Sequence, residues 1–100
     1  MAIPPYSIEL RPAAMRDLAA IAQHIAKDNP ARAASFVAEL RNKLSPLAQH
    51  PNLGRTGRPG LPKGIRELSV HRNYIAFYRV LASKKVVEVV NVKHAAQRLP

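Results

Sequence analysis

The order of apolar and polar residues predicts a short strand and then a helix at the start of the chain. Residues 6–10 alternate between apolar and polar side chains, which is typical of a strand. Pro12 suits the first turn of a helix, where its missing N–H costs nothing. The residues that follow it form an apolar stripe at helical spacing, made up of Ala14, Leu18, Ile21 and Ile25.

A second helix is predicted directly after the first. Asn29 is a good helix cap and Pro30 again suits a first turn. Pro46 removes a helical hydrogen bond, so we expect a bend there and an end near residues 50–51. Two helices joined by so short a turn should lie side by side as a hairpin. The apolar face of the second helix holds Ala33, Val37, Leu40, Leu44 and Leu47.

The second half of the chain changes from a loop to strands. Residues 52–64 are rich in glycine and proline and predict a loop. Three strands follow, over residues 65–70, 74–81 and 86–92, with turns at Arg72-Asn73 and at residues 82–85. The prediction is therefore one α+β domain over residues 1–100. Its element order is β-α-α-β-β-β, with the helix hairpin packed on a small, mostly antiparallel four-stranded sheet.

The last two strands carry apolar residues on both faces. Ile75 and Phe77 alternate with Ala76, Tyr78 and Val80. A helix hairpin covers only one face of a sheet, so the other face should be apolar and open to a partner. The alternative is that loop and tail residues cover it.

Charge narrows the class of partner. The 100 residues include 16 Lys and Arg against 6 Asp and Glu, which gives a net charge of +10. Such a chain attracts polyanions, so we expect its partner to be a nucleic acid, a nucleoprotein or an acidic protein. The alternative is a basic soluble protein whose charge serves no partner. There is no cysteine, no apolar run long enough to span a membrane and no leader-like start, so we expect the cytoplasm.

Familiar catalytic and cofactor motifs are missing from the sequence. No paired carboxylates are evident, and most of the six acidic residues fit solvated positions, so we expect no metal, no cofactor and no small-molecule substrate. His94, after the last strand, is a candidate general acid or base for phosphodiester cleavage, although a lone histidine is more often structural.

Taken in order, several segments resemble the ParE-type toxins of bacterial type II toxin–antitoxin systems, in the RelE/ParE superfamily. The resemblance covers nearly the whole chain. The segments are PAAMRDL at 12–18, IAQHIAKDNP at 21–30, LAQHPNLGR at 47–55, GIREL at 64–68, YIAFYRV at 74–80 and VNVKHAAQR at 90–98.

The resemblance implies a toxin that arrests growth, stabilises plasmids and is neutralised by a cognate antitoxin with an acidic tail. Such a tail would satisfy both the positive charge and the uncovered sheet face. The residues expected to bind the antitoxin are Leu68, Val70, Ile75, Phe77 and Arg79. Those expected to bind the cellular target are Arg55, Arg58, Lys63, Arg72, Lys93 and Arg98.

The resemblance leaves the target open. The ParE branch is associated with inhibition of DNA gyrase by binding, which is the favoured interpretation. The RelE branch cleaves messenger RNA on the ribosome, and Arg66, Arg79 and His94 occupy places comparable to its basic residues. The chain has no tyrosine in its tail, and lysine ahead of the second strand is reduced to Lys63. A third interpretation is a toxin that has lost its activity and only helps its antitoxin to bind DNA.

Overall fold

The computed structural model describes residues 5–57 and 59–96. Within them the predicted α+β order is confirmed, with one strand added. The helices are α1 (Pro12–Ala26) and α2 (Pro30–Asn42), with short 3-10 turns η1 (Ser45–Ala48) and η2 (Ala82–Lys84). The strands are β1 (Ser7–Leu10), β2 (Arg55–Thr56), β3 (Arg66–His71), β4 (Tyr74–Leu81) and β5 (Val86–His94).

The strands form one sheet in the order β1-β5-β4-β3-β2. β1 pairs with β5 in parallel, and the other neighbours are antiparallel. The prediction of four strands was therefore wrong by one, since β2 lies inside the predicted loop. Its two residues are too few to show an alternating pattern in the sequence.

Both helices begin where the prolines predict. Pro12 and Pro30 occupy the first turns of α1 and α2, and the Asn29 side chain accepts a hydrogen bond from the Arg32 N–H as the expected cap. α2 ends at Asn42 and η1 follows around Pro46, so the expected bend is confirmed.

The helices cover one face of the sheet and bury a core of mostly aliphatic side chains. Leu18 and Ile21 of α1 face Leu40 of α2 and the β4 and β5 side chains that point the same way. Phe36 is also in this core and contacts Tyr74 edge-on, a role that the predicted α2 stripe missed. The remaining core residues are Ala14, Leu44, Leu47, Val70, Ala76, Tyr78, Val87, Val89 and Val92.

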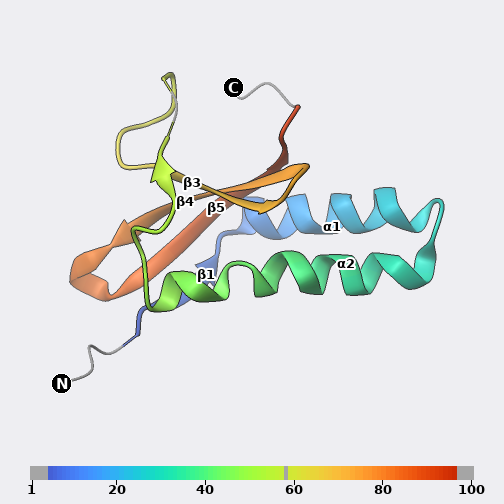
Figure 1. The fold of residues 1–100 in the computed structure, drawn as a ribbon, viewed down its shortest axis with the longest axis horizontal. Coiled ribbons are helices and arrows are strands. Elements are labelled where there is room, and N and C mark those ends of the chain that lie inside the picture. The colour runs from blue at the N-terminus through green and yellow to red at the C-terminus, as the bar shows by residue number, and fades with distance from the viewer. Residues whose placement is uncertain (1–4, 58, 97–100) are drawn as a thin grey trace.

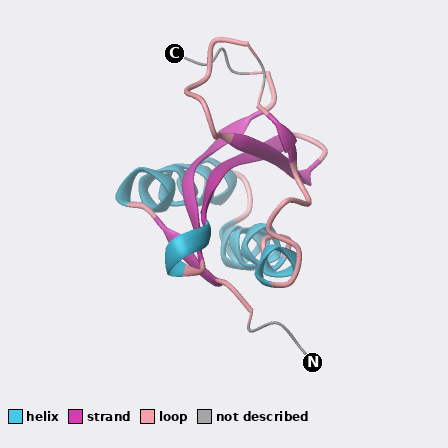
Figure 2. Cartoon of the chain, turned by 90° about the vertical axis from the view of Figure 1, so that its left-hand side faces the viewer, coloured by secondary structure: helices cyan, strands magenta, loops and turns pink. Residues whose placement is uncertain are grey.

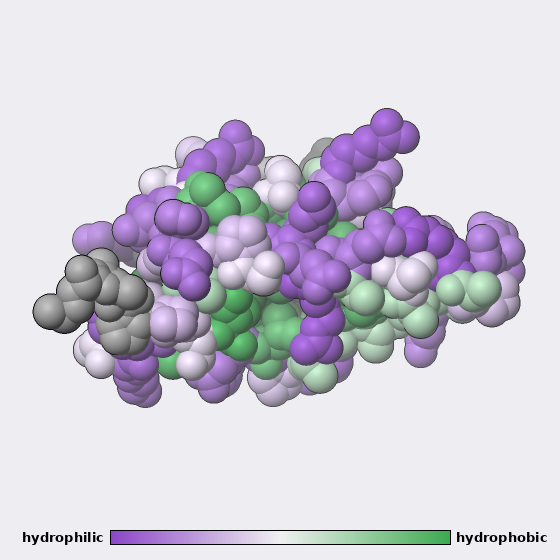
Figure 3. Space-filling view, turned by 60° about the horizontal axis from the view of Figure 1, so that its bottom comes forward, coloured by the Kyte–Doolittle hydropathy of each residue, from purple (hydrophilic) through white to green (hydrophobic). Residues whose placement is uncertain are grey.

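The pictures show the resulting layers. In Figure 1 α1 and α2 lie together below the sheet, and the loop after β2 rises on the other side. Figure 2 shows the strong twist of the sheet. Seen from the helix side, hydrophobic residues are visible in the middle of the surface between hydrophilic ones (Figure 3). No helix in the described part of the chain is long and apolar enough to cross a membrane.

β5 runs on beyond the end of β1, and a side chain of α1 takes the place of a strand there. β1 ends at Leu10, opposite Val89. The Asp17 carboxylate accepts hydrogen bonds from the Val92 N–H (2.9 Å), the Asn91 amide (3.0 Å) and Lys93 Nζ (3.0 Å). Asp17 therefore joins the helix hairpin to the exposed edge of β5.

Candidate partner-binding surface

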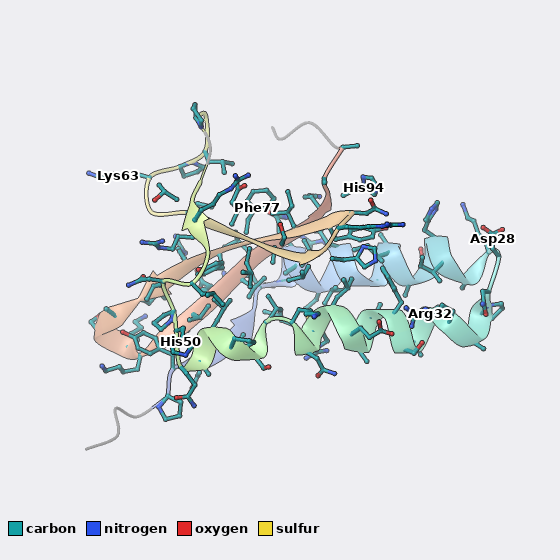
Figure 4. All side chains as sticks on the ribbon, viewed as in Figure 1. Asp28, Arg32, His50, Lys63, Phe77 and His94 are labelled. Atoms are coloured by element: carbon teal, nitrogen blue, oxygen red, sulfur yellow. The ribbon has the colours of Figure 1, made fainter. Side chains whose placement is uncertain are left out.

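The face of the sheet turned away from the helices, called the open face below, is the predicted docking surface. Side chains alternate between the two faces along β4. Ala76 and Tyr78 belong to the core under the helices, so Ile75, Phe77 and Arg79 lie on the open face. Figure 4 shows Phe77 on the side of the sheet away from α1 and α2.

One row of charged residues crosses the open face at Glu88. Glu88 is directly opposite Arg79 in the β4–β5 pairing and is only 9% exposed. One carboxylate oxygen accepts a hydrogen bond from Arg79 Nε at 2.6 Å, and the other lies 3.7 Å from Arg11 Nη1. The two arginine side chains are 51% and 56% exposed, so both guanidinium groups reach solvent from a buried carboxylate.

A second row crosses the same face beside Phe77. Glu67 lies opposite both Phe77 of β4 and Arg55 of β2. Glu67 is 4% exposed, and its Oε1 accepts from Arg55 Nε at 2.7 Å and lies 2.6 Å from Arg55 Nη2. Phe77 itself is 4% exposed, whereas Ile75 is half-buried.

The open face is therefore less apolar than its sequence pattern predicted. Its apolar residues are Phe77, which is as buried as a core residue, and Ile75, which is half-buried, and the guanidinium groups of Arg55 and Arg79 lie beyond them on two sides. The expectation of an uncovered apolar face is therefore wrong at Phe77, on the side of the sheet where the loop after β2 rises (Figure 1). The interpretation of the acidic residues as solvated was wrong for Glu67, which is buried in an ion pair like Glu88. Alternation along β3 and β5 turns both carboxylates to this face, where arginines of neighbouring strands pair with them.

The residues predicted to bind the antitoxin do not all share one surface. Ile75, Phe77 and Arg79 do lie together on the open face. Val70 is instead 4% exposed in the core, and Leu68 packs against that core. Alternation along β3 turns Leu68 and Val70 toward the helices, while Glu67 points the other way.

The residues predicted to bind the target are dispersed. Arg55 is paired with Glu67 and Lys93 with Asp17. Lys63 lies in the loop after β2, and Arg72 lies in the turn between β3 and β4. The last two members of the set, Arg58 and Arg98, are outside the described residues.

Arg66 belongs to a partly buried cluster where β2 meets the core. Arg66 Nη1 donates to the Gly54 carbonyl at 2.7 Å, and the Gly54 N–H donates to the Tyr78 hydroxyl at 2.8 Å. Burial raises the pKa of Tyr78, while the Gly54 N–H and the Arg66 charge act in the opposite direction. A Cβ on Gly54 would lie 2.5 Å from the Glu67 carbonyl, which explains glycine in the 47–55 segment.

His94 lies apart from the two arginines proposed to share a nuclease site with it. Its partner on β4 is Tyr74, which lies five positions from Arg79 along the strand, or about 17 Å. The His94 ring contacts the core residue Tyr74 edge-on, with centroids 5.2 Å apart, so it lies toward the helix side of the sheet. The structure does not bring Arg66, Arg79 and His94 around one phosphate-sized site.

The pocket beside His94 and the arrangement of possible metal ligands were the other candidate sites. A hollow of about 380 Å³ beside His94 is lined by α1 and the ends of β4 and β5, including Asp17, His24 and Tyr74. Among residues 5–57 and 59–96, no three histidine, aspartate or glutamate side chains are placed to hold a metal ion.

A small, basic α+β chain with a helix hairpin under a mostly antiparallel sheet has the architecture of the RelE/ParE toxins. The sequence model described as "ParE toxin of type II toxin-antitoxin system, parDE" matches residues 8–99. The chain therefore belongs to the ParE toxin family of type II toxin–antitoxin systems.

Similar proteins agree with this placement. "Putative toxin Y4kP" of Sinorhizobium fredii is 39% identical over 88 residues, which cover 87% of this chain and 85% of that protein. The solved chromosomal ParDE toxin–antitoxin system from P. aeruginosa has a TM-score of 0.76 at 28% identity, covering 92% of this chain and 98% of that one. The E. coli RelBE complex has a TM-score of 0.62 at 18% identity, covering 92% and 99%, and shares the fold.

Proposed function

We propose that this protein arrests growth by binding DNA gyrase in the cytoplasm, and that a co-encoded antitoxin with an acidic tail neutralises it by covering the open face. The toxin acts by binding rather than by cleaving bonds. The observation that carries the proposal is the arrangement of the open face, where exposed guanidinium groups surround the buried Phe77 and the half-buried Ile75 instead of a catalytic cluster.

An antitoxin partner is supported by charge and by the relatives. A net charge of +10 on 100 residues favours an acidic partner. The P. aeruginosa structure that resembles this chain is a ParDE toxin–antitoxin system. A flexible acidic tail that folds on the open face would bring carboxylates to Arg55 and Arg79 and apolar side chains to the half-buried Ile75.

The gyrase interpretation is favoured over the nuclease one by family and by geometry. The family model that matches is the ParE model, and the RelE structures share only the fold at this level of identity. Cleavage of RNA by general acid–base chemistry needs a proton-transferring group within hydrogen-bond reach of the reacting atoms. His94 lies about 17 Å along the sheet from the position of Arg79, which argues against a shared phosphate site.

The test compares purified protein in two assays. In a gyrase supercoiling assay we expect dose-dependent inhibition that the antitoxin reverses. In a translating extract we expect messenger RNA to stay intact. Full supercoiling at a large excess of toxin would reject the gyrase proposal, and ribosome-dependent cuts that disappear in His94→Ala would support the nuclease alternative.

Variants and growth assays refine the test. Lys63→Ala, in the loop after β2, should weaken gyrase inhibition, whereas Lys43→Ala, just after α2, makes the same charge change on the helix side and should not. Normal growth on expression without the antitoxin would contradict an active toxin and favour the inactive, DNA-binding accessory.

A further inference from the structure

The arginines of the open face are already bound to carboxylates of their own chain. Glu88 contacts Arg79 and Arg11, and Glu67 contacts Arg55. The carboxylates are buried, while the three arginine side chains are 51%, 56% and 75% exposed. Each guanidinium has five N–H donors in a fixed fork, so an arginine held from below can still present donors to a second anion above it.

The chemistry of this face fits an acidic peptide better than a nucleic acid. Among the described residues, Arg11, Arg55 and Arg79 contact two buried carboxylates on this face, and Glu9 stands beside Glu88 on β1. Duplex DNA carries one charge per about 1.7 Å and needs a larger surplus of positive charge. A peptide instead offers separate carboxylates and apolar side chains, which match exposed arginines on the same face as the half-buried Ile75.

We propose that Glu88 and Glu67 are internal competitors of an acidic, apolar-anchored partner segment, and that they limit its affinity for the open face. The proposal rests on the proposed function, in which the antitoxin tail binds this face. A partner carboxylate shares the arginines with Glu88 or Glu67 and is repelled by them. Removing the negative charge, while keeping the side chain in place, therefore tightens binding.

Glutamine makes this change with little loss of shape. The Glu88→Gln amide oxygen still accepts from Arg79 Nε, so the arginine stays oriented while the charge is lost. A partner carboxylate on the far side of the guanidinium lies about 7 Å from Glu88, where repulsion falls between its bulk-water and protein-surface limits and should change affinity by about tenfold. Added salt should reduce this gain.

Glu39→Gln is the matched control. Glu39 is hydrogen-bonded to Arg32 on the exposed side of α2, away from the open face. The hydrogen bond from Arg32 lowers the pKa of Glu39, so Gln removes one negative charge there as well. Any effect of overall net charge on binding appears equally in this variant.

The experiment measures fluorescence anisotropy of a short labelled glutamate-rich peptide with one central leucine, titrated with the full chain at low ionic strength. We expect Glu88→Gln and Glu67→Gln to bind about tenfold more tightly than Glu39→Gln. Thermal unfolding checks that each variant folds. Glu88→Gln and Glu67→Gln test the competition independently, because the two carboxylates belong to different charged rows of the open face.

The outcomes separate this inference from the proposed function. If the wild-type chain binds the peptide but both open-face variants bind it no better than Glu39→Gln, the internal-competitor proposal is overturned alone. If no form binds the peptide, the antitoxin role of the face falls too. Tighter binding of a labelled mixed-sequence DNA duplex than of the peptide would overturn the choice of an acidic peptide as occupant.

Discussion

Replacing Gly54 with alanine should destabilise the protein strongly through one added methyl group. A Cβ at this position would lie 2.5 Å from the Glu67 carbonyl oxygen and 2.7 Å from the Tyr78 hydroxyl. The carbonyl belongs to the backbone of paired strand β3 and cannot turn aside. Overpacking of this kind costs about 1–3 kcal/mol. Loss of the 2.8 Å hydrogen bond to the buried Tyr78 hydroxyl adds about 1–2 kcal/mol.

The expected loss is therefore about 2–5 kcal/mol, a large part of the roughly 5–15 kcal/mol that stabilises a typical domain. For a chain of this size, a loss of 3 kcal/mol lowers the Tm by roughly 10–25 °C. Thermal unfolding followed by circular dichroism, with urea unfolding at fixed pH, measures both quantities.

Gly60→Ala is the control for the Gly54 prediction. Gly60 has a φ of +95°, but no heavy atom lies within 4 Å of the place that an alanine Cβ would take, so alanine there meets backbone strain without a clash. We expect a cost of about 1 kcal/mol. If Gly54→Ala stays within about 1 kcal/mol of the wild type, the close packing of Gly54 against β3 and Tyr78 is refuted.

Three further predictions concern single side chains. Asp17→Ala removes the carboxylate that holds the edge of β5 and should lower the free energy of unfolding by about 2 kcal/mol in urea titrations; an unchanged midpoint would contradict the anchoring role. Burial raises the pKa of Tyr78, so the stability it contributes is complete below the ordinary tyrosine value of 10.0 and is lost as pH rises through the folded-state pKa. Urea titrations at a series of alkaline pH values should show that the free energy of unfolding falls with pH in the wild type and falls less in Tyr78→Phe. Equal slopes of unfolding free energy against pH in the two proteins would contradict this role of Tyr78. Lys85 has a φ of 55°, so Lys85→Gly should raise the Tm slightly, by the equivalent of about 0.5 kcal/mol, and a fall would argue against backbone strain there.

Local signals were sufficient to predict most of the fold. Pro12 and Pro30 predicted where the helices start, because proline fits a helix only in its first turn. The turn at Arg72-Asn73 also lies where the sequence pattern predicted it. The strand β2 could not be predicted, since two residues carry no periodicity.

The site was harder to predict because it depends on contacts between strands. Alternation predicts correctly which β4 side chains share a face. It does not predict whether Leu68 of β3 lies on the same face as Phe77 of β4, because that depends on how the two strands are paired. The burial of Glu67 and Glu88 depends likewise on arginines from neighbouring strands. Asp17 lies about 75 residues from its partners in β5, too far for any local pattern to reveal.

We propose that this toxin stops gyrase by binding it. The most direct test of this proposal is the amount of double-strand-broken plasmid that detergent releases from gyrase reactions as the toxin concentration rises. Broken plasmid should increase with toxin and return to the baseline when the antitoxin is added first. A flat baseline at every toxin concentration, with supercoiling intact, would contradict the claim.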